Sequence, residues 1–503
     1  MNYTLIYWAA FIIYSVIVVG IGFYIWFKRR KDPPPSDTQQ YWASNKKMSG
    51  FLIGLSISAS MMSISWSCVY GVQLFYWYGT GAAWLLVIPW LITMCGFFLF
   101  APLFRKLQAF SQPELIAKRF GNNLRQVIAI PLIFVFIVWG GAEIYAAGIT
   151  IAPFLKISPE ATMFLIALII ALYTYTGGFQ AVVSTDRIQF GFVAIFVIVI
   201  AYIGLKTIGS ENISTGLFSA DSLAPKANVG SHGFFSPGIA LIAMTFFAYL
   251  PGWLVETDVW IRLQAARNNK EARKGIFVAG FNSLVFVGIL PMIIGLSALL
   301  LYSPVNGEVP AKLQDGALIF ANIMQDFSPG WLNVLLGIGL LAASMSTVDT
   351  CGNVVALSIS YDVLEPHFSK KWDSKKLNML AQWVSVAAVF IAFFYALFTN
   401  SLWDIFYLSS GVLTTTIFIP VIASFLRNTN KRQVALATVL GFVGTIVFYF
   451  FEAKGHLKII EPDWLSTTGV GYIVLGFLCG LIGFLIGGRI KNNSKETQQS
   501  ASL

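Results

Sequence analysis

The stretch Leu340–Ser360 (LLAASMSTVDTCGNVVALSIS) carries hydroxyl groups and an acid in a segment long enough to cross a bilayer. Ser346, Thr347 and Thr350 recur at helical spacing, so their side chains share one face of a helix. Asp349 lies beside them. A carboxylate at membrane depth is unfavourable unless a partner compensates it, so such an acid indicates a functional site. Neutral oxygens beside an acid are suitable ligands for a small, hard cation such as Na⁺.

Two further segments differ from plain apolar spans. Gly54–Gly71 (GLSISASMMSISWSCVYG) contains six serines, and Phe246–Arg262 (FFAYLPGWLVETDVWIR) carries Pro251 in its middle. Proline removes a backbone donor and clashes with the preceding turn, so we expect the second helix to break near 250–252. Interrupted helices at membrane depth are found where they line a cavity or are buried in protein.

The composition indicates the elements that must position these residues. The chain has 503 residues, of which 57% are hydrophobic and 11% charged, whereas a soluble domain has about 25% charged residues. Apolar runs of about 20 residues recur along the whole length, which predicts an all-α polytopic membrane protein. We expect thirteen transmembrane helices, at 4–27, 49–77, 80–104, 126–153, 159–178, 186–208, 234–264, 275–302, 330–362, 377–398, 401–426, 432–452 and 466–488.

The basic residues predict the topology. With thirteen spans, the loops on one side, together with the C-terminal tail, hold 27 of the 33 Lys and Arg residues. The positive-inside rule then places the N-terminus outside and the C-terminus in the cytoplasm of a plasma (inner) membrane protein. The net charge of +10 is therefore a property of the topology, and nucleic acid is not an expected partner.

Nothing in the sequence indicates catalysis. The four cysteines lie in or beside spans without a CxxC pair, and the three histidines are scattered. No nucleophile stands with a base and an orienting residue, and no cofactor motif is present, so an enzyme is not expected. The first apolar run is too long for the core of a signal peptide.

The two disturbed segments suggest an internal repeat. One opens a set of five spans at 49–77, and the other opens the next set at 234–264. Disturbed helices in corresponding positions of two halves are typical of inverted-repeat transporters, and an odd number of spans per repeat requires inversion. We therefore expect five residue ranges: an extra helix and linker at 1–48, repeats at 49–208 and 209–428, two extra helices at 429–490, and a tail at 491–503.

A sodium site is predicted where the serine-rich segment Gly54–Gly71 meets the segment Leu340–Ser360. In a five-plus-five inverted repeat, the unwound part of the first core helix lies beside the eighth. Five neutral oxygens would then form a cage, namely the carbonyls of Ala59, Met62 and Ala343 and the hydroxyls of Ser346 and Thr347. The alternative is that these small and hydroxyl residues are ordinary helix-packing contacts.

A second cation site is a further hypothesis. Asp186 stands at the cytoplasmic start of a span. It either pairs with the adjacent Arg187 or shares a cation with Asp349 and Thr350.

Substrate contacts are predicted around the same breaks. Two acids and two tryptophans lie well inside spans, and serines flank the first break; the candidates are Ser60, Ser63, Trp139, Glu143, Trp253 and Glu256. The alternative for the aromatic residues is that they are simply frequent, because 15% of all residues are aromatic.

Asp258 and Arg262 stand four residues apart in the segment that contains Pro251. They are expected to pair on the helix, and Arg262 to reach toward the cytoplasmic loop.

Several motifs together carry a resemblance. They are LSISASMMS, FSQPELIAKRFG, YTYTGGFQAVVSTDRIQ, RLQAARNNKEARKG and AASMSTVDT, in that order. With them the chain resembles the sodium:solute symporter family, which includes bacterial proline, sialic acid, pantothenate and sugar transporters and animal glucose, iodide and choline carriers. The resemblance implies a leucine-transporter-type core, alternating access and Na⁺ as the coupling ion.

The resemblance implies the same five sodium ligands, and in members with a second Na⁺ it implies an acid that matches Asp186. Met61 occupies the place of an aspartate in proline carriers, which argues against a simple proline carrier. Asp349 occupies the place of a hydroxyl in sugar carriers, where choline-type carriers are similar to this chain. Trp139 matches a tryptophan of choline carriers, whereas Glu256 falls where that group has another tryptophan.

The expected function is inward symport of a small polar organic solute driven by the Na⁺ gradient. The alternative is a transporter-like sensor or channel without concentrative uptake. The acids favour a neutral, zwitterionic or cationic solute over an anion. The expected partners are the lipid bilayer and the solute, with the chain acting as a monomer.

Overall fold

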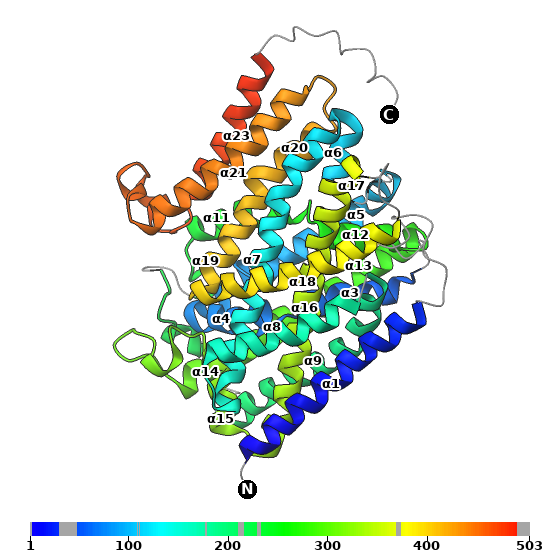
Figure 1. Ribbon diagram of the computed structural model, residues 1–503. Helices are drawn as coiled ribbons and strands as arrows, with labels where there is room; N and C mark the ends of the chain where they lie inside the picture. Colours follow the sequence, from blue (N-terminus) through cyan, green and yellow to red (C-terminus); the bar gives the residue numbers. More distant parts are fainter. Residues whose placement is uncertain are drawn as a thin grey trace.

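Figure 1 shows the computed structural model, which describes residues 3–29, 48–107, 109, 111–176, 179–209, 216–228, 233–368 and 374–489. Nearly all of these residues are helical, apart from two isolated β-bridges and connecting turns. The long helices are α1 (Tyr3–Arg29), α5 (Val87–Lys106), α7 (Asn122–Leu155), α8 (Pro159–Thr176), α9 (Phe179–Ile208), α16 (Gly330–Leu357), α18 (Ser374–Phe398), α21 (Lys431–Ala453) and α23 (Tyr472–Arg489). Shorter helices are α6 (Gln112–Phe120), α13 (Asn269–Ser283), α14 (Leu290–Leu301), α15 (Ile319–Phe327), α17 (Glu365–Phe368), α19 (Leu402–Val412), α20 (Ile419–Ala423) and α22 (Asp463–Ser466). Most of the expected linker and the tail lie outside the described residues.

The number of spans is not fixed at the expected thirteen by the described residues. Ten described helices are long and apolar enough to cross a membrane, and two bent helix pairs raise the number to twelve if each pair is one span. The segment expected at 159–178 is α8, whose 18 residues are close to the roughly 20 residues that cross a bilayer. A count of thirteen is therefore not confirmed.

The serine-rich segment is a broken helix, as its sequence predicts. α3 (Gly50–Met61) and the helix that begins at Ile64 are bent by 52° at a short break. Ser63 has an extended backbone, and its hydroxyl accepts the Trp66 amide N–H at 2.9 Å, so Ser63 is the N-cap of the second half. This half is called the outer half, after the topology expected from the basic residues. This half consists of a π-helical segment, η2 (Ile64–Gly71), followed by α4 (Val72–Tyr78).

The second break lies later than expected. α11 (Ile239–Trp253) includes Pro251 and ends two residues beyond it, and α12 (Thr257–Ala265) follows at an angle of 42°. Because a proline disrupts bonding to the turn before it, the helix can continue for a short distance after the ring. The Gly252 amide donates to the Thr414 hydroxyl at 3.0 Å. The break therefore falls at 254–256 and not at 250–252.

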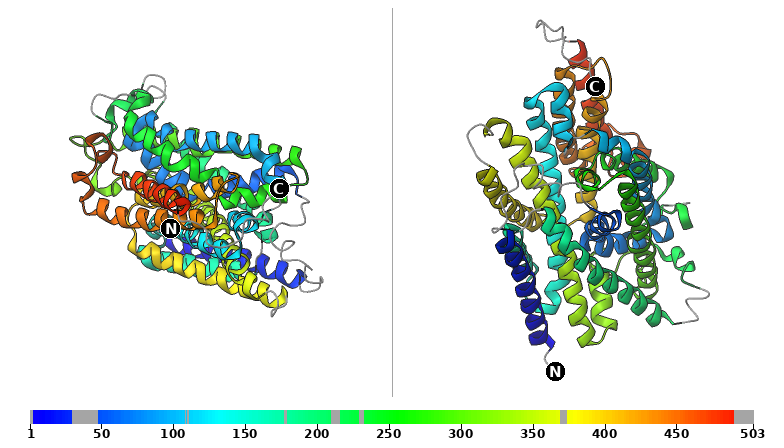
Figure 2. Two further views of the ribbon diagram at one scale, coloured as in Figure 1. Left: turned by 90° about the horizontal axis from the view of Figure 1, so that it is seen from above. Right: turned by 90° about the vertical axis from the view of Figure 1, so that its right-hand side faces the viewer.

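The core is built around the central helices α7 and α16, which pack on each other and on α18. α3 packs closely on α13, where a Cβ atom added at Gly54 would lie 2.6 Å from the Val278 side chain. α1 lies against α8 and α16 at one edge, and α21 and α23 pack along each other at the opposite edge (Figure 1). The right-hand view of Figure 2 likewise shows the first and last helices at opposite ends of the molecule.

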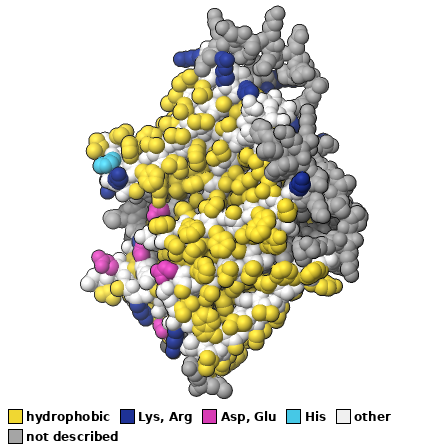
Figure 3. All heavy atoms as spheres, in the orientation of Figure 1, with side chains coloured by type: hydrophobic (Ala, Val, Ile, Leu, Met, Phe, Trp, Pro, Cys, Tyr) yellow, Lys and Arg dark blue, Asp and Glu magenta, His cyan; other side chains and the backbone are white. Residues whose placement is uncertain are grey.

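The surface is that of a membrane protein. In Figure 3, apolar side chains cover most of the middle of the visible face, and charged side chains gather toward its ends. The start of α1 and the end of α23 lie at opposite ends of the molecule in Figure 1. Large apolar side chains such as Leu5, Leu99 and Phe398 are exposed along the outer helices, as contact with lipid requires.

Candidate functional site

A cavity of about 70 Å³ lies between the two broken helices. It has room for roughly five water molecules. Its walls come from the α3 end and η2, from the junction of α11 and α12, and from α5, α7, α16 and α19. Five of the six predicted substrate residues line it, namely Ser60, Ser63, Trp139, Trp253 and Glu256.

Glu143, the sixth predicted substrate residue, is not among the residues that line the cavity. It is fully buried in α7, and its carboxylate caps the start of η2. The Ile64 amide donates to Oε1 at 2.8 Å, and the Ser65 amide and hydroxyl donate to Oε2 at 3.0 and 2.6 Å. The first amides of a helix have no partner within it and attract negative charge. Glu143 is therefore placed as a support of the outer half-helix and not as a wall of the cavity.

The five residues of the predicted sodium site lie on the two helices that meet beside the cavity. Ala59, Met62, Ala343 and Ser346 are buried. Thr347 bridges the helices, because its hydroxyl lies 3.4 Å from both the Ser60 and the Ala343 carbonyl oxygens as a shared donor.

The oxygens of this region suit Na⁺. Because α3 stops at Met61, the carbonyls of its last turn, that of Ala59 among them, have no partner further along the same helix. Carbonyl and hydroxyl oxygens are hard, neutral ligands. The donor set therefore fits a monovalent cation better than a soft metal, and no cluster of three or more His, Cys, Asp or Glu with metal-binding geometry occurs in the described part of the chain.

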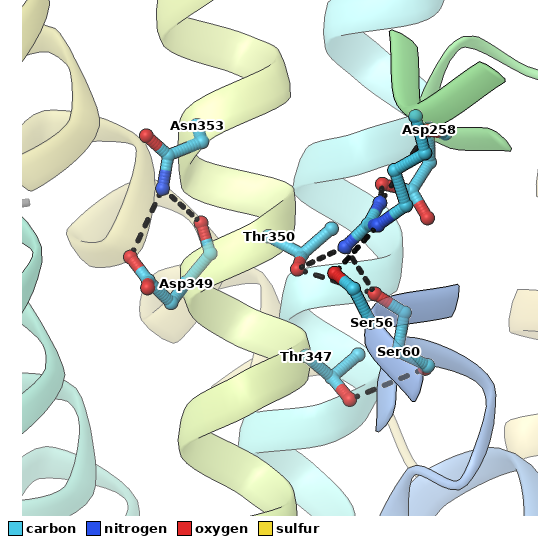
Figure 4. A network of polar contacts seen from close by, with 8 residues as sticks. Ser56, Ser60, Asp258, Thr347, Asp349, Thr350 and Asn353 are labelled. Atoms are coloured by element: carbon cyan, nitrogen blue, oxygen red, sulfur yellow. Dashed lines mark hydrogen bonds and ion pairs between the residues drawn. The ribbon is translucent and has the colours of Figure 1, made fainter. Parts of the chain in front are cut away.

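Arg262 lies next to these oxygens, and not at the cytoplasmic surface as expected. Its side chain is 2% exposed and forms the predicted ion pair with Asp258. It also donates to the hydroxyls of Ser56 at 2.9 Å, Ser60 at 3.0 Å and Thr350 at 3.4 Å. Figure 4 shows these groups converging from α3, α12 and α16. The guanidinium thus ties the inner half of each broken helix to α16.

The proposed second cation site is not assembled from the groups that the structure describes. In Figure 4, Asp349 and Thr350 point to opposite sides of α16. The Asn353 amide donates to Asp349 Oδ1 at 3.0 Å, and the Ser60 hydroxyl donates to Thr350 at 3.2 Å. Asp186 belongs to α9, but its side chain lies outside the described residues.

The aromatic wall of the cavity is larger than the sequence indicated. Trp66 lies edge to face with Trp253 at 5.5 Å between ring centroids and with Phe406 at 4.7 Å, and Trp90 lies 5.4 Å from Trp253. Trp66 follows the serine-rich break by three residues, which was a usable signal. Nothing in the sequence separated Trp90 or Phe406 from the many other aromatic residues.

Fold and site together define a class. Two interrupted helices that meet at a small cavity, with freed backbone groups beside it, are characteristic of secondary transporters.

The family follows from sequence comparison. A family model described as Sodium:solute symporter family matches residues 41–441, so this chain belongs to the sodium:solute symporter family. Over 493 aligned residues, it is 26% identical to a sodium/glucose cotransporter of Vibrio parahaemolyticus, with 91% of this chain and 87% of the relative covered. It is 24% identical over 478 residues to a sodium/sialic acid symporter of Aliivibrio fischeri, with 90% and 91% covered.

A solved structure supports the fold. The chain is similar to a Na⁺-coupled sialic acid symporter in a substrate-bound outward-open state, with a TM-score of 0.72, 18% identity, and 97% and 98% of the two chains covered. This likeness confirms the expected all-helical fold with a leucine-transporter-type core. The residue boundaries of the two repeats remain predictions.

Proposed function

We propose that this protein uses the Na⁺ gradient to carry a small organic solute into the cell by alternating access. The observation that carries the proposal is the Thr347 hydroxyl, which joins the end of α3 to α16 at the edge of the cavity. A cation bound here would contact α3 and α16, which both line the cavity, and would therefore affect the geometry of the solute site directly. Family membership and the Na⁺ symporters among its relatives support the same activity.

Coupling follows from differential affinity. Na⁺ at Ala59, Met62, Ala343, Ser346 and Thr347 would hold the broken helix against α16 and so favour the conformation whose cavity binds solute. Solute binding then favours Na⁺ binding by the same factor, since linkage is reciprocal. Each charge that crosses a membrane at 100 mV contributes about 2.3 kcal/mol, in addition to the Na⁺ concentration gradient.

Arg262 fits the inner gate of this cycle. It contacts α3 through Ser56 and Ser60 and contacts α16 through Thr350. Opening toward the cytoplasm requires the inner half of the broken helix to leave α16, so these hydrogen bonds must break. The network would therefore hold the inner side closed while the protein faces outward. It would open when the protein, loaded with Na⁺ and solute, changes to the inward-facing state.

The topology belongs to the same proposal. The N-terminus lies outside and the C-terminus in the cytoplasm, as the distribution of basic residues favours. The opposite positions of the first and last helix ends support an odd number of crossings. Asp186 remains a candidate ligand of a second cation.

Transport in proteoliposomes tests the proposal. With Na⁺ outside and K⁺ inside, a screened solute should accumulate above its external concentration, and accumulation should stop when an ionophore removes the Na⁺ gradient. A sensor would bind without uptake, and a channel would only equilibrate the solute. Either result with a solute that binds the protein would refute Na⁺-coupled symport.

A further inference from the structure

Glu256 lines the cavity with a carboxylate of which one oxygen has no hydrogen-bond partner among the described residues. It lies at the junction of α11 and α12, lines the cavity and is 1% exposed. Its Oε1 atom is buried and has no hydrogen-bond partner in the described part of the chain. A buried carboxylate without a partner is strongly unfavourable, so it takes up a proton or is complemented by a cation.

The neighbouring cationic side chain is engaged with other groups. Arg262 pairs with Asp258 and donates hydrogen bonds to the hydroxyls of Ser60 and Thr350. A guanidinium that is engaged in this way also offers little to the carboxylate of a solute.

The start of the outer half-helix, which is the other feature that could bind an anion, is already occupied. A broken helix exposes amide groups at the start of its outer half, and these are well suited to a carboxylate. In this chain, Glu143 accepts the amides of Ile64 and Ser65, and the Ser63 hydroxyl accepts that of Trp66. The protein's own oxygens thus occupy the place where the carboxylate of an amino acid or a sugar acid would bind.

The aromatic wall has little donor capacity left for a neutral polyol. The indole N–H groups of Trp90, Trp139 and Trp253 donate to serine hydroxyls at 3.0, 2.7 and 3.1 Å, namely those of Ser283, Ser409 and Ser410. What these rings offer the cavity is π-electron density, which attracts cations and above all organic ammonium groups.

On the basis of the proposed function, we infer that the solute is a compact organic ammonium ion that lacks a carboxylate. Its nitrogen lies between the Glu256 carboxylate and the rings of Trp66 and Trp253. The cavity of about 70 Å³ suits a compact cation.

Matched probes test the charge directly on the wild-type protein. Tetramethylammonium and choline are compared by calorimetry with 3,3-dimethyl-1-butanol, the uncharged carbon analogue of choline, and with glycine betaine, which adds a carboxylate. In Na⁺ buffer, at least one of the two cations should bind at least tenfold more tightly than the alcohol and than betaine. Binding of the alcohol or betaine within threefold of the cations, or binding of neither cation, would overturn the inference.

Variants locate the site. Glu256→Gln keeps the size of the side chain but removes its charge, and should raise the Kd of the bound cation at least tenfold. Trp253→Leu should raise it as well, whereas Glu308→Gln on an exposed loop should not. An unchanged Kd in Glu256→Gln would contradict the assignment; if that variant does not fold, the wild-type comparison decides alone. Equal cation binding in Na⁺ and K⁺ buffers would refute Na⁺ coupling and leave the ammonium site standing.

Discussion

Replacing Glu143 by glutamine tests how the outer half-helix is held. The carboxylate accepts three hydrogen bonds, from the Ile64 amide and from the amide and hydroxyl of Ser65. Glutamine has one acceptor oxygen, and its NH₂ group would face an N–H donor at the other position. Hydrogen bonds to a charged group contribute about 1.5–3 kcal/mol each, and a buried donor left unpaired costs about 1–3 kcal/mol.

The easier burial of a neutral amide offsets part of this loss, because a carboxylate is costly to remove from water. We therefore expect Glu143→Gln to lower the free energy of unfolding by about 2 kcal/mol, roughly the value of one charged hydrogen bond. Solute affinity should fall with it, since Ser63, Ser65 and Trp66 line the cavity.

Equilibrium unfolding in mixed SDS micelles gives the change in stability. Thr150→Val is the matched control, because Thr150 is equally buried in α7 but bonds only to the Ala146 carbonyl of its own helix. It should change the free energy of unfolding by less than about 1 kcal/mol. A Glu143→Gln protein as stable as this control, with wild-type solute affinity, would show that Glu143 does not hold the outer half-helix.

Three further predictions concern other parts of the molecule. Thr347→Val removes the bridging hydroxyl at constant volume, so the Na⁺ concentration for half-maximal uptake should rise at least about tenfold, or 1.4 kcal/mol; unchanged Na⁺ activation would exclude Thr347 as a ligand. Arg262→Met leaves Asp258 buried without its partner, which should cost about 3–5 kcal/mol of unfolding free energy; the double variant with Asp258→Asn should regain part of it, and failure to do so would argue against the pair. Burial raises the pKa of Glu461, in the loop between α21 and α23, from 4.5 to about 7. The folded protein then binds more protons than the unfolded chain, so stability should decrease as pH rises from about 4.5 to about 7. Thermal unfolding of wild type and Glu461→Gln should show this slope only in wild type, and equal slopes would contradict it.

The features that could be predicted from sequence are those with a local cause. The serine run between Ser56 and Ser67 marks the first break because serine hydroxyls compete for backbone bonds and cap helix starts. Pro251 predicts the second break correctly in kind, but its position depends on the bond from Gly252 to Thr414, which comes from a distant helix. The number of spans is not decided at α8, whose 18 residues are close to the length that crosses a bilayer.

The features that escaped prediction depend on contacts between distant residues. Glu143 lies 78 or more positions from the amides that it caps. Without knowledge of these partners, an acid inside a span is interpreted as a substrate ligand. Arg262 lies next to a loop in sequence, but its guanidinium turns inward to Ser56 and Asp258. The aromatic wall was predicted in part. Trp253 was found because it lies near a break, whereas no feature of the sequence marks Phe406.

Reciprocal binding measures the central claim most directly, namely that Na⁺ at the junction of α3 and α16 organises the solute cavity. The Kd of a solute identified by screening is measured with and without Na⁺, and the Kd of Na⁺ is measured with and without that solute. The two ratios should be equal and clearly above one, and both should approach one in Thr347→Val. A wild-type solute Kd that is the same in Na⁺ and in K⁺ would contradict the claim.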